Sequence, residues 1–88
     1  MNCLRKAERL VWGSRNKQYG HPGKDYARTA KIWSGILADK LKEDITPKEA
    51  VLMMVGVKLS REIHKHHEDN LIDAAGYIAC AERVETGK

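Results

Sequence analysis

Two helices meet in the stretch Glu62-Ile-His-Lys-His-His-Glu-Asp69-Asn-Leu-Ile-Asp73-Ala-Ala-Gly-Tyr77, where carboxylates, imidazoles and cations gather at a predicted turn. Asp69 and Asp73 are four residues apart, so a helix that begins here carries both on one face. Glu62 lies near the end of the preceding helix, and an antiparallel turn would bring it towards Asp73. Three such oxygen ligands suit Mg²⁺, which completes its shell with water and phosphate. We therefore predict a metal site at these three carboxylates.

The helices on either side of this turn have their own signals. Thr46-Pro47-Lys48-Glu49 combines a threonine N-cap, a proline at the first helical position and a glutamate three residues after the cap. A helix is predicted to begin there. It is apolar on nearly every side from Ala50 to Leu59, which predicts a central helix buried against several partners or against another subunit. Asp69 is the expected N-cap of the next helix.

Two more helices are predicted in the N-terminal half. An apolar rhythm from Leu4 to Val11 indicates a helix that Gly13 and the following polar run bring to an end. Two glycines and a proline then predict a loop over residues 19–24. The next helix, from about Asp25, carries an apolar stripe of Tyr26, Ala30, Trp33, Leu37 and Leu41. The fold class is therefore all-α, a compact bundle of about four short helices, with Trp12 and Trp33 as packing residues.

Composition limits the chain to one domain over residues 1–88. Hydrophobic residues make up 42% and charged residues 32%, which indicates a folded unit with a well-solvated surface. A domain of this size buries only roughly 60% of its unfolded surface, so self-association is expected. The net charge of +4 favours an anionic partner. Two distant cysteines, no signal-peptide pattern and no membrane-length apolar run predict a reduced cytoplasmic protein without a membrane segment.

The cations and aromatic residues near the turn suggest a phosphate site with alternatives. Lys58, Arg61 and Lys65 are spaced three and four residues apart and could hold phosphates, or they could form a solvated helix face. Tyr19 and its loop neighbours could contact a base or sugar, or they could serve backbone geometry. The histidines at positions 64, 66 and 67 lack the partners of a zinc finger, so a solvated turn is favoured over a zinc site.

The three carboxylates also have structural interpretations. Asp69 could act only as the helix cap, because an aspartate before a helix commonly satisfies free backbone amides. Asp73 is flanked by apolar residues and needs a partner, which a metal or a structural pair with Lys or Arg could supply. Glu62 could pair with Lys58 or Lys65 on its own helix. The sequence leaves these alternatives open.

Several motifs in fixed order carry a family resemblance, and they include Lys17-Gln-Tyr-Gly-His-Pro22, Ala30-Lys-Ile-Trp33, Ile45-Thr-Pro-Lys-Glu49 and Ile72-Asp-Ala-Ala-Gly-Tyr77. With them, residues from about 8 to 83 resemble small phage and prophage proteins of unassigned function that are often labelled MazG-like. MazG-type proteins are all-α nucleoside triphosphate pyrophosphatases, which cleave (d)NTPs to monophosphate and pyrophosphate. They use Mg²⁺ held by an E-x-x-E motif on one helix and an E-x-x-D motif on the next.

The resemblance implies a nucleotide ligand, Mg²⁺ or Mn²⁺ as cofactor, and a dimer or tetramer in the cytoplasm of a bacterial host. Asn70-Leu-Ile-Asp73 keeps the aspartate of the second motif, but Leu52-Met-Met-Val55 stands where the first motif would be. The predicted function is a pyrophosphohydrolase that acts on (d)NTPs with Mg²⁺. The alternatives are a nucleotide-binding module without hydrolysis and a module that contacts nucleic acid or a host protein. Nucleic acid ranks last, because no helix shows a clear cluster of basic and aromatic residues. The predicted catalytic and metal-binding residues are Glu62, Asp69 and Asp73, and the predicted substrate-binding residues are Lys58, Arg61, Lys65, Tyr19 and Tyr77.

Overall fold

Every regular element of the protein is helical in the computed structural model, which describes residues 1–88. The elements are α1 (Cys3–Arg9), the π-helical segment η1 (Leu10–Ser14), α2 (Arg15–Tyr19), α3 (Pro22–Ile36), α4 (Pro47–His64) and α5 (Glu68–Thr86). Because α1, η1 and α2 follow one another without a break, they form one helical arm, and the chain consists of four helical rods. The all-α prediction is confirmed.

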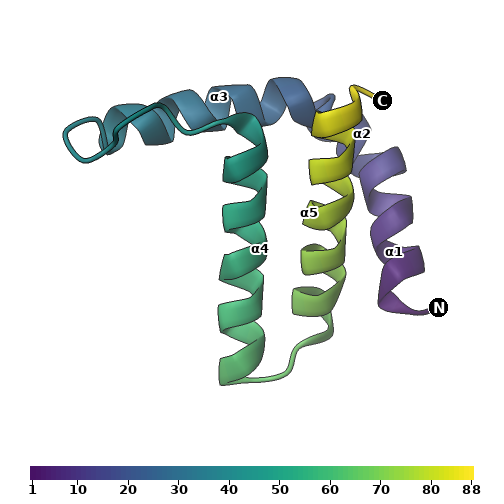
Figure 1. Ribbon diagram of the computed structural model, residues 1–88. Coiled ribbons are helices and arrows are strands. Elements are labelled where there is room, and N and C mark those ends of the chain that lie inside the picture. Colours follow the sequence, from purple (N-terminus) through teal and green to yellow (C-terminus); the bar gives the residue numbers. More distant parts are fainter.

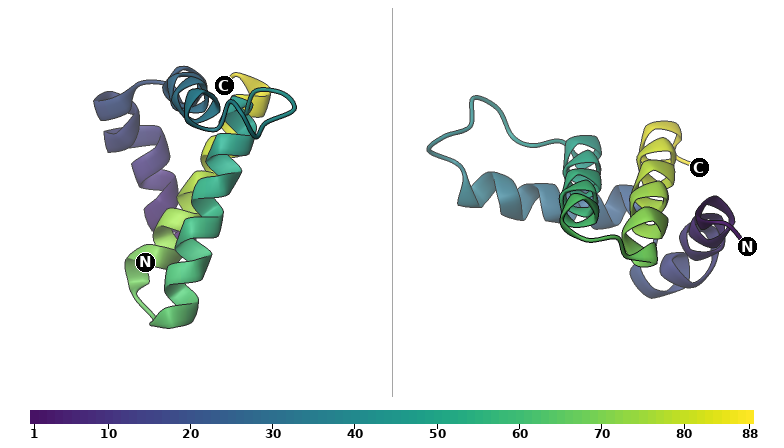
Figure 2. Two further views of the ribbon diagram at one scale, coloured as in Figure 1. Left: turned by 90° about the vertical axis from the view of Figure 1, so that its left-hand side faces the viewer. Right: turned by 90° about the horizontal axis from the view of Figure 1, so that it is seen from below.

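The arm, α3 and α4 are arranged around α5 (Figure 1). Helices α4 and α5 run antiparallel side by side, and α3 crosses one end of this pair. The view from below in Figure 2 shows α5 between α4 and α1. The radius of gyration is 13.6 Å, near the roughly 12 Å expected for this length, so the bundle is compact. The central helix is α5, whereas the sequence predicted α4.

The core is built from small and medium side chains where α5 meets its neighbours. Its buried cluster consists of Val11, Val51, Tyr77, Cys80 and Ala81. On α4 only Ala50 and Val51 are buried, and large apolar side chains of that helix stay exposed, namely Leu52, Met53, Val57, Leu59 and Ile63. The predicted burial of α4 on nearly every side is therefore wrong for a single chain. Self-association, which would cover this face, stays a prediction.

The N-terminal helix was predicted to end at Gly13, but the arm continues through η1 and α2 to Tyr19. A glycine inside a helix costs about 1 kcal/mol relative to alanine. Contacts on both sides of Gly13 offset this cost, because Arg83 of α5 donates from Nη1 to the backbone oxygen of Val11 (3.2 Å) and to Oδ1 of Asn16 (2.8 Å). The helical arm thus continues past Gly13 because hydrogen bonds from Arg83 of α5 stabilise it.

Helix α3 begins earlier and ends earlier than predicted. Helix α2 ends before Gly20, whose φ is 79°. His21 caps α3, because its Nδ1 accepts a hydrogen bond from the backbone N–H of Gly23 at 2.9 Å. The helix therefore starts at Pro22, not near Asp25. Its end at Ile36 places Leu41, the last member of the predicted stripe, outside it.

Helix α4 begins as predicted. The hydroxyl of Thr46 accepts from the backbone N–H of Glu49 at 3.1 Å, and Oε1 of Glu49 accepts from the backbone N–H of Thr46 at 2.9 Å. The hydrogen bond from the Thr46 backbone, more than the one from its side chain, lowers the pKa of Glu49. None of the helices has the length and apolar character that crossing a bilayer would require.

Candidate functional site

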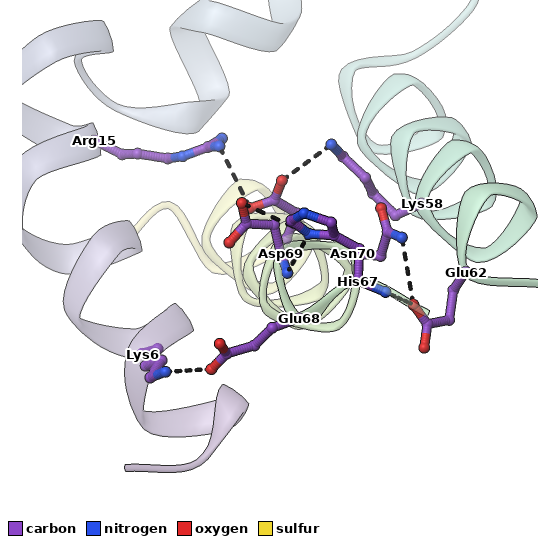
Figure 3. Close-up of polar contacts among 9 residues, drawn as sticks. Lys6, Arg15, Lys58, Glu62, His67, Glu68, Asp69 and Asn70 are labelled. Atoms are coloured by element: carbon purple, nitrogen blue, oxygen red, sulfur yellow. Dashed lines mark hydrogen bonds and ion pairs between the residues drawn. The ribbon is translucent and has the colours of Figure 1, made fainter. Parts of the chain in front are cut away.

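Glu62, in the last turn of α4, holds the turn that leads to α5. Its Oε1 accepts hydrogen bonds from the backbone N–H of His67 (3.0 Å) and from Nδ2 of Asn70 (3.3 Å). Its Oε2 lies 2.5 Å from Nδ1 of His66, so it pairs with this imidazole and not with a lysine of its own helix. The bond with His66, followed by the one from the His67 backbone, lowers the pKa of Glu62. Figure 3 shows Glu62 reaching from α4 toward Asn70.

Asp69 lies in the first turn of α5 and is not its cap, so the cap prediction was wrong. The cap is His67, whose Nδ1 accepts a hydrogen bond from the backbone N–H of Asp69 at 3.4 Å. An imidazole nitrogen can accept this bond just as a carboxylate oxygen would, which is why the predicted position was two residues late. The side chain of Asp69 is 75% exposed and remains available for a ligand.

Asp73 lies one turn further along α5, between two cations from other helices. Nζ of Lys58 on α4 lies 3.0 Å from its Oδ2, and Nη2 of Arg15 on α2 lies 3.9 Å from its Oδ1. The side chain of Asp73 is only 19% exposed, so this pairing compensates for its partial burial. Arg15 also lies over the ring of Tyr77, with its guanidinium carbon 5.4 Å from the ring centroid. The structure therefore supplies the Lys or Arg partner that the sequence left as an alternative to metal.

A groove runs between α1 and the N-terminal end of α5. Lys6 and Arg9 line it from α1, Asp69 and Asp73 line it from α5, and apolar side chains lie between them, including Leu10 and Ile72. Glu68, beside Asp69, pairs with Lys6, and Figure 3 shows this pair joining the two helices. The groove thus combines cations, carboxylates and an apolar surface.

The remaining predicted site residues lie in other places. Tyr19 is exposed at a small hollow between α2 and α3 that Arg15 also lines. Tyr77 is buried and packs edge-on against Tyr26, with the two ring centroids 6.4 Å apart. Arg61 and Lys65 are exposed near the end of α4 and line no surface depression. Of the predicted substrate-binding residues, only Lys58 lies beside the carboxylates.

Mg²⁺ is the metal that the resemblance implies, and the three carboxylates do not fit a shared site for it in one chain. Asp73 already has Lys58 and Arg15 as partners, and Glu62 is engaged in the α4–α5 turn. No three or more His, Cys, Asp or Glu side chains lie together where they could hold a metal ion. The metal roles of Glu62, Asp69 and Asp73 stay predictions.

Sequence reasoning missed the cations of the arm. Lys6 and Arg9 are three residues apart on a short helix, and this spacing alone resembles any solvated face. Arg15 was hidden because the arm was predicted to end before it. Trp12, interpreted as a packing residue, is 54% exposed. Predicting one continuous helix over residues 3–19 would have fixed how these side chains are placed around its axis.

Comparison with known proteins gives a family and two relatives. The family model described as a domain of unknown function, DUF6378, matches residues 2–85. The chain is 35% identical over 84 residues to the gene 55 protein of Mycobacterium phage D29 and 30% identical over 86 residues to that of Mycobacterium phage L5. These alignments cover 94% and 97% of this chain but 53% of each relative, so the chain spans about half their length. No solved structure matches the chain.

Proposed function

The chain belongs to the DUF6378 family, and we propose that this domain binds nucleotides in the groove between α1 and α5. The observation that carries the proposal is the convergence of cations on the N-terminal half of α5. Lys6 and Arg9 line the groove from α1, while Arg15 of α2 and Lys58 of α4 pair with Asp73, a carboxylate of the groove. Cations brought from several helices to one place suit a ligand with several negative charges, such as a di- or triphosphate.

The other groups of the groove favour a nucleotide over a simple anion. Lys6 and Arg9 would contact phosphate oxygens, Arg through a bidentate fork and Lys as a point charge. Leu10 and Ile72 offer apolar surface to a sugar or base. Asp69, exposed and outside the cap, can accept hydrogen bonds from ribose hydroxyls or a base amino group.

The pairing of Asp73 explains how such a site stays ready without its ligand. Lys58 and Arg15 balance the charge of Asp73 and hold this carboxylate in place at the groove before a ligand binds. The distance of 3.9 Å from Nη2 of Arg15 to Oδ1 of Asp73 is long for a hydrogen bond, so Arg15 forms a looser ion pair with Asp73 than Lys58 does at 3.0 Å. The MazG-like resemblance supports a role in nucleotide metabolism, and the phage relatives support a place of action inside a bacterial host.

Hydrolysis is the second candidate, and one observation favours it. Asp69 and Asp73 line the same groove one helical turn apart, which is the spacing at which two carboxylates can share a divalent cation. In this alternative Asp69 and Asp73 would hold Mg²⁺ or Mn²⁺, and Glu62 would stay in the α4–α5 turn, outside the metal site. The involvement of Glu62 in the turn and the missing first motif make nucleotide binding without turnover the better supported function.

The test is a titration of the purified protein with (d)NTPs, with and without Mg²⁺, followed by calorimetry. The double variant Lys6→Ala/Arg9→Ala should weaken binding by at least roughly tenfold, because each charge-assisted hydrogen bond contributes about 1.5–3 kcal/mol. Lys40→Ala/Lys42→Ala is the matched control, since it removes the same charge from the exposed turn after α3, far from α1 (Figure 1). Equal loss in both variants would mean that overall charge, and not the groove, attracts the nucleotide. Absence of binding by the unaltered chain would overturn the proposal.

A further inference from the structure

A second surface of the arm combines cations with an exposed aromatic ring. Arg5 and Arg9 are four residues apart on α1, and Trp12 follows three residues later in η1. Together with Glu8 and Gly13 they line one shallow depression. Arg5, Arg9 and Trp12 are all exposed. Arg9 also lines the α1–α5 groove, whereas Arg5 and Trp12 lie outside it.

The indole of Trp12 is held in place although it is exposed. The guanidinium of Arg83 lies over the ring, with its central carbon 4.1 Å from the ring centroid. Arg83 is itself only 6% exposed and is fixed by hydrogen bonds to the backbone oxygen of Val11 and to Oδ1 of Asn16. Because a fixed cation backs one face of the ring and 54% of Trp12 is exposed, the outer face is free and preorganised.

The ring of Trp12 lies on the outside of the π-helical segment η1. In η1 the backbone N–H of Arg15 bonds to the oxygen of Leu10, five residues back, which shifts the helical register by one residue. Val11, four residues after the buried Ala7, is 2% exposed, and its neighbour Trp12 faces out. Such π segments are frequent at functional sites.

We propose that Arg5, Arg9 and Trp12 form a second binding site, for a nucleobase that carries a phosphate, as in a short single-stranded nucleic acid. The base stacks on the outer face of Trp12, and the adjoining phosphates contact the two arginines. Positively charged surfaces with exposed aromatic rings bind single strands in this way, because every base has a face to stack. Glu8 lies in the same depression and weakens the attraction, so removing its charge should strengthen binding. The site goes beyond the proposed function, since Arg5 and Trp12 do not line the α1–α5 groove.

The experiment measures fluorescence anisotropy of a labelled short oligothymidylate at low salt. Trp12→Ala should weaken binding roughly 5- to 150-fold, the usual range for losing one stacked base, whereas Trp12→Phe should retain most of the affinity. Arg5→Ala/Arg9→Ala should lower the slope of log K against log salt by about 1.4, because each neutralised phosphate of a single strand contributes about 0.7. Glu8→Gln should bind more tightly, and the remote control Lys40→Ala/Lys42→Ala should keep its affinity.

Two further measurements separate the possible ligands and the two sites. In a Trp33→Phe background Trp12 is the sole tryptophan, and stacking should quench its emission on adding oligothymidylate. Thymidine triphosphate, tested alone, shows whether a mononucleotide suffices or a strand is required. Lys6→Ala should leave the quenching unchanged, which distinguishes this site from the groove. The proposal is overturned if the oligonucleotide causes neither quenching nor an anisotropy change, or if Trp12→Ala and both arginine substitutions leave the affinity intact in folded protein.

Discussion

Replacing Asp73 with asparagine tests how α2, α4 and α5 are joined. The substitution removes the charge that Lys58 and Arg15 share, while the size of the side chain is kept. Exposed ion pairs contribute about 0–1 kcal/mol, and breaking a fully buried pair costs about 3–5 kcal/mol. The side chains of Lys58 and Asp73 are 15% and 19% exposed, so the cost lies between these limits, at about 2 kcal/mol. For a domain of this size, that is a fall in Tm of roughly 8–16 °C.

Thermal and urea unfolding followed by circular dichroism measure this loss. Asp69→Asn is the matched control, because Asp69 is 75% exposed and its substitution should change stability by less than about 0.5 kcal/mol. Lys58→Met added to Asp73→Asn should recover part of the loss, since it removes the cation left without its partner. Equal Tm values for Asp73→Asn and the unaltered chain would refute the assignment of Asp73 to this ion-pair network.

Three further predictions concern other parts of the fold. Hydrogen bonds lower the pKa of Glu62 in the folded state. The ionised Glu62 therefore stabilises the fold above the unfolded carboxyl pKa, and this effect is lost as the pH falls through the folded pKa. The Glu62→Gln variant should lose less stability than the unaltered chain between about pH 5 and pH 3 in urea unfolding. Gly56→Ala should raise Tm by roughly 4–8 °C in a thermal melt, because a Cβ there meets no atom within 4 Å and alanine favours α4 by about 1 kcal/mol. Burial raises the pKa of the Cys80 thiol, so it should react with a thiol reagent far more slowly than the partly exposed Cys3, and equal rates in Cys80→Ala and Cys3→Ala would contradict its burial.

The parts of the fold that the sequence predicted well depend on local interactions. The start of α4 is an example, because Thr46 and Glu49 satisfy each other's backbone groups within one turn. The end of the N-terminal helix was wrong because what continues it is distant in sequence. Asn16 and Val11 are bonded by Arg83, from the far end of the chain, and no local pattern could reveal that contact.

The same distinction applies to the candidate site. The spacing of Asp69 and Asp73 correctly indicated one helix face, and both residues line one groove. Their surroundings could not be predicted, because Arg15 reaches Asp73 only through the unexpected continuation of the arm. Helical spacing also suggested that Trp12 packs inside, whereas it is 54% exposed beside Arg83.

The measurement that tests the central claim most directly is incubation of the purified protein with Mg²⁺ or Mn²⁺ and a pooled set of NTPs, dNTPs and cyclic nucleotides. Mass spectrometry then reads both the products and the ligand retained on the protein. We predict that intact nucleotide is retained and that Lys6→Ala/Arg9→Ala loses it. Release of monophosphate and pyrophosphate would contradict binding without turnover and establish the hydrolytic alternative. If the protein neither retains a nucleotide nor releases a product, the proposed nucleotide site in the groove is contradicted.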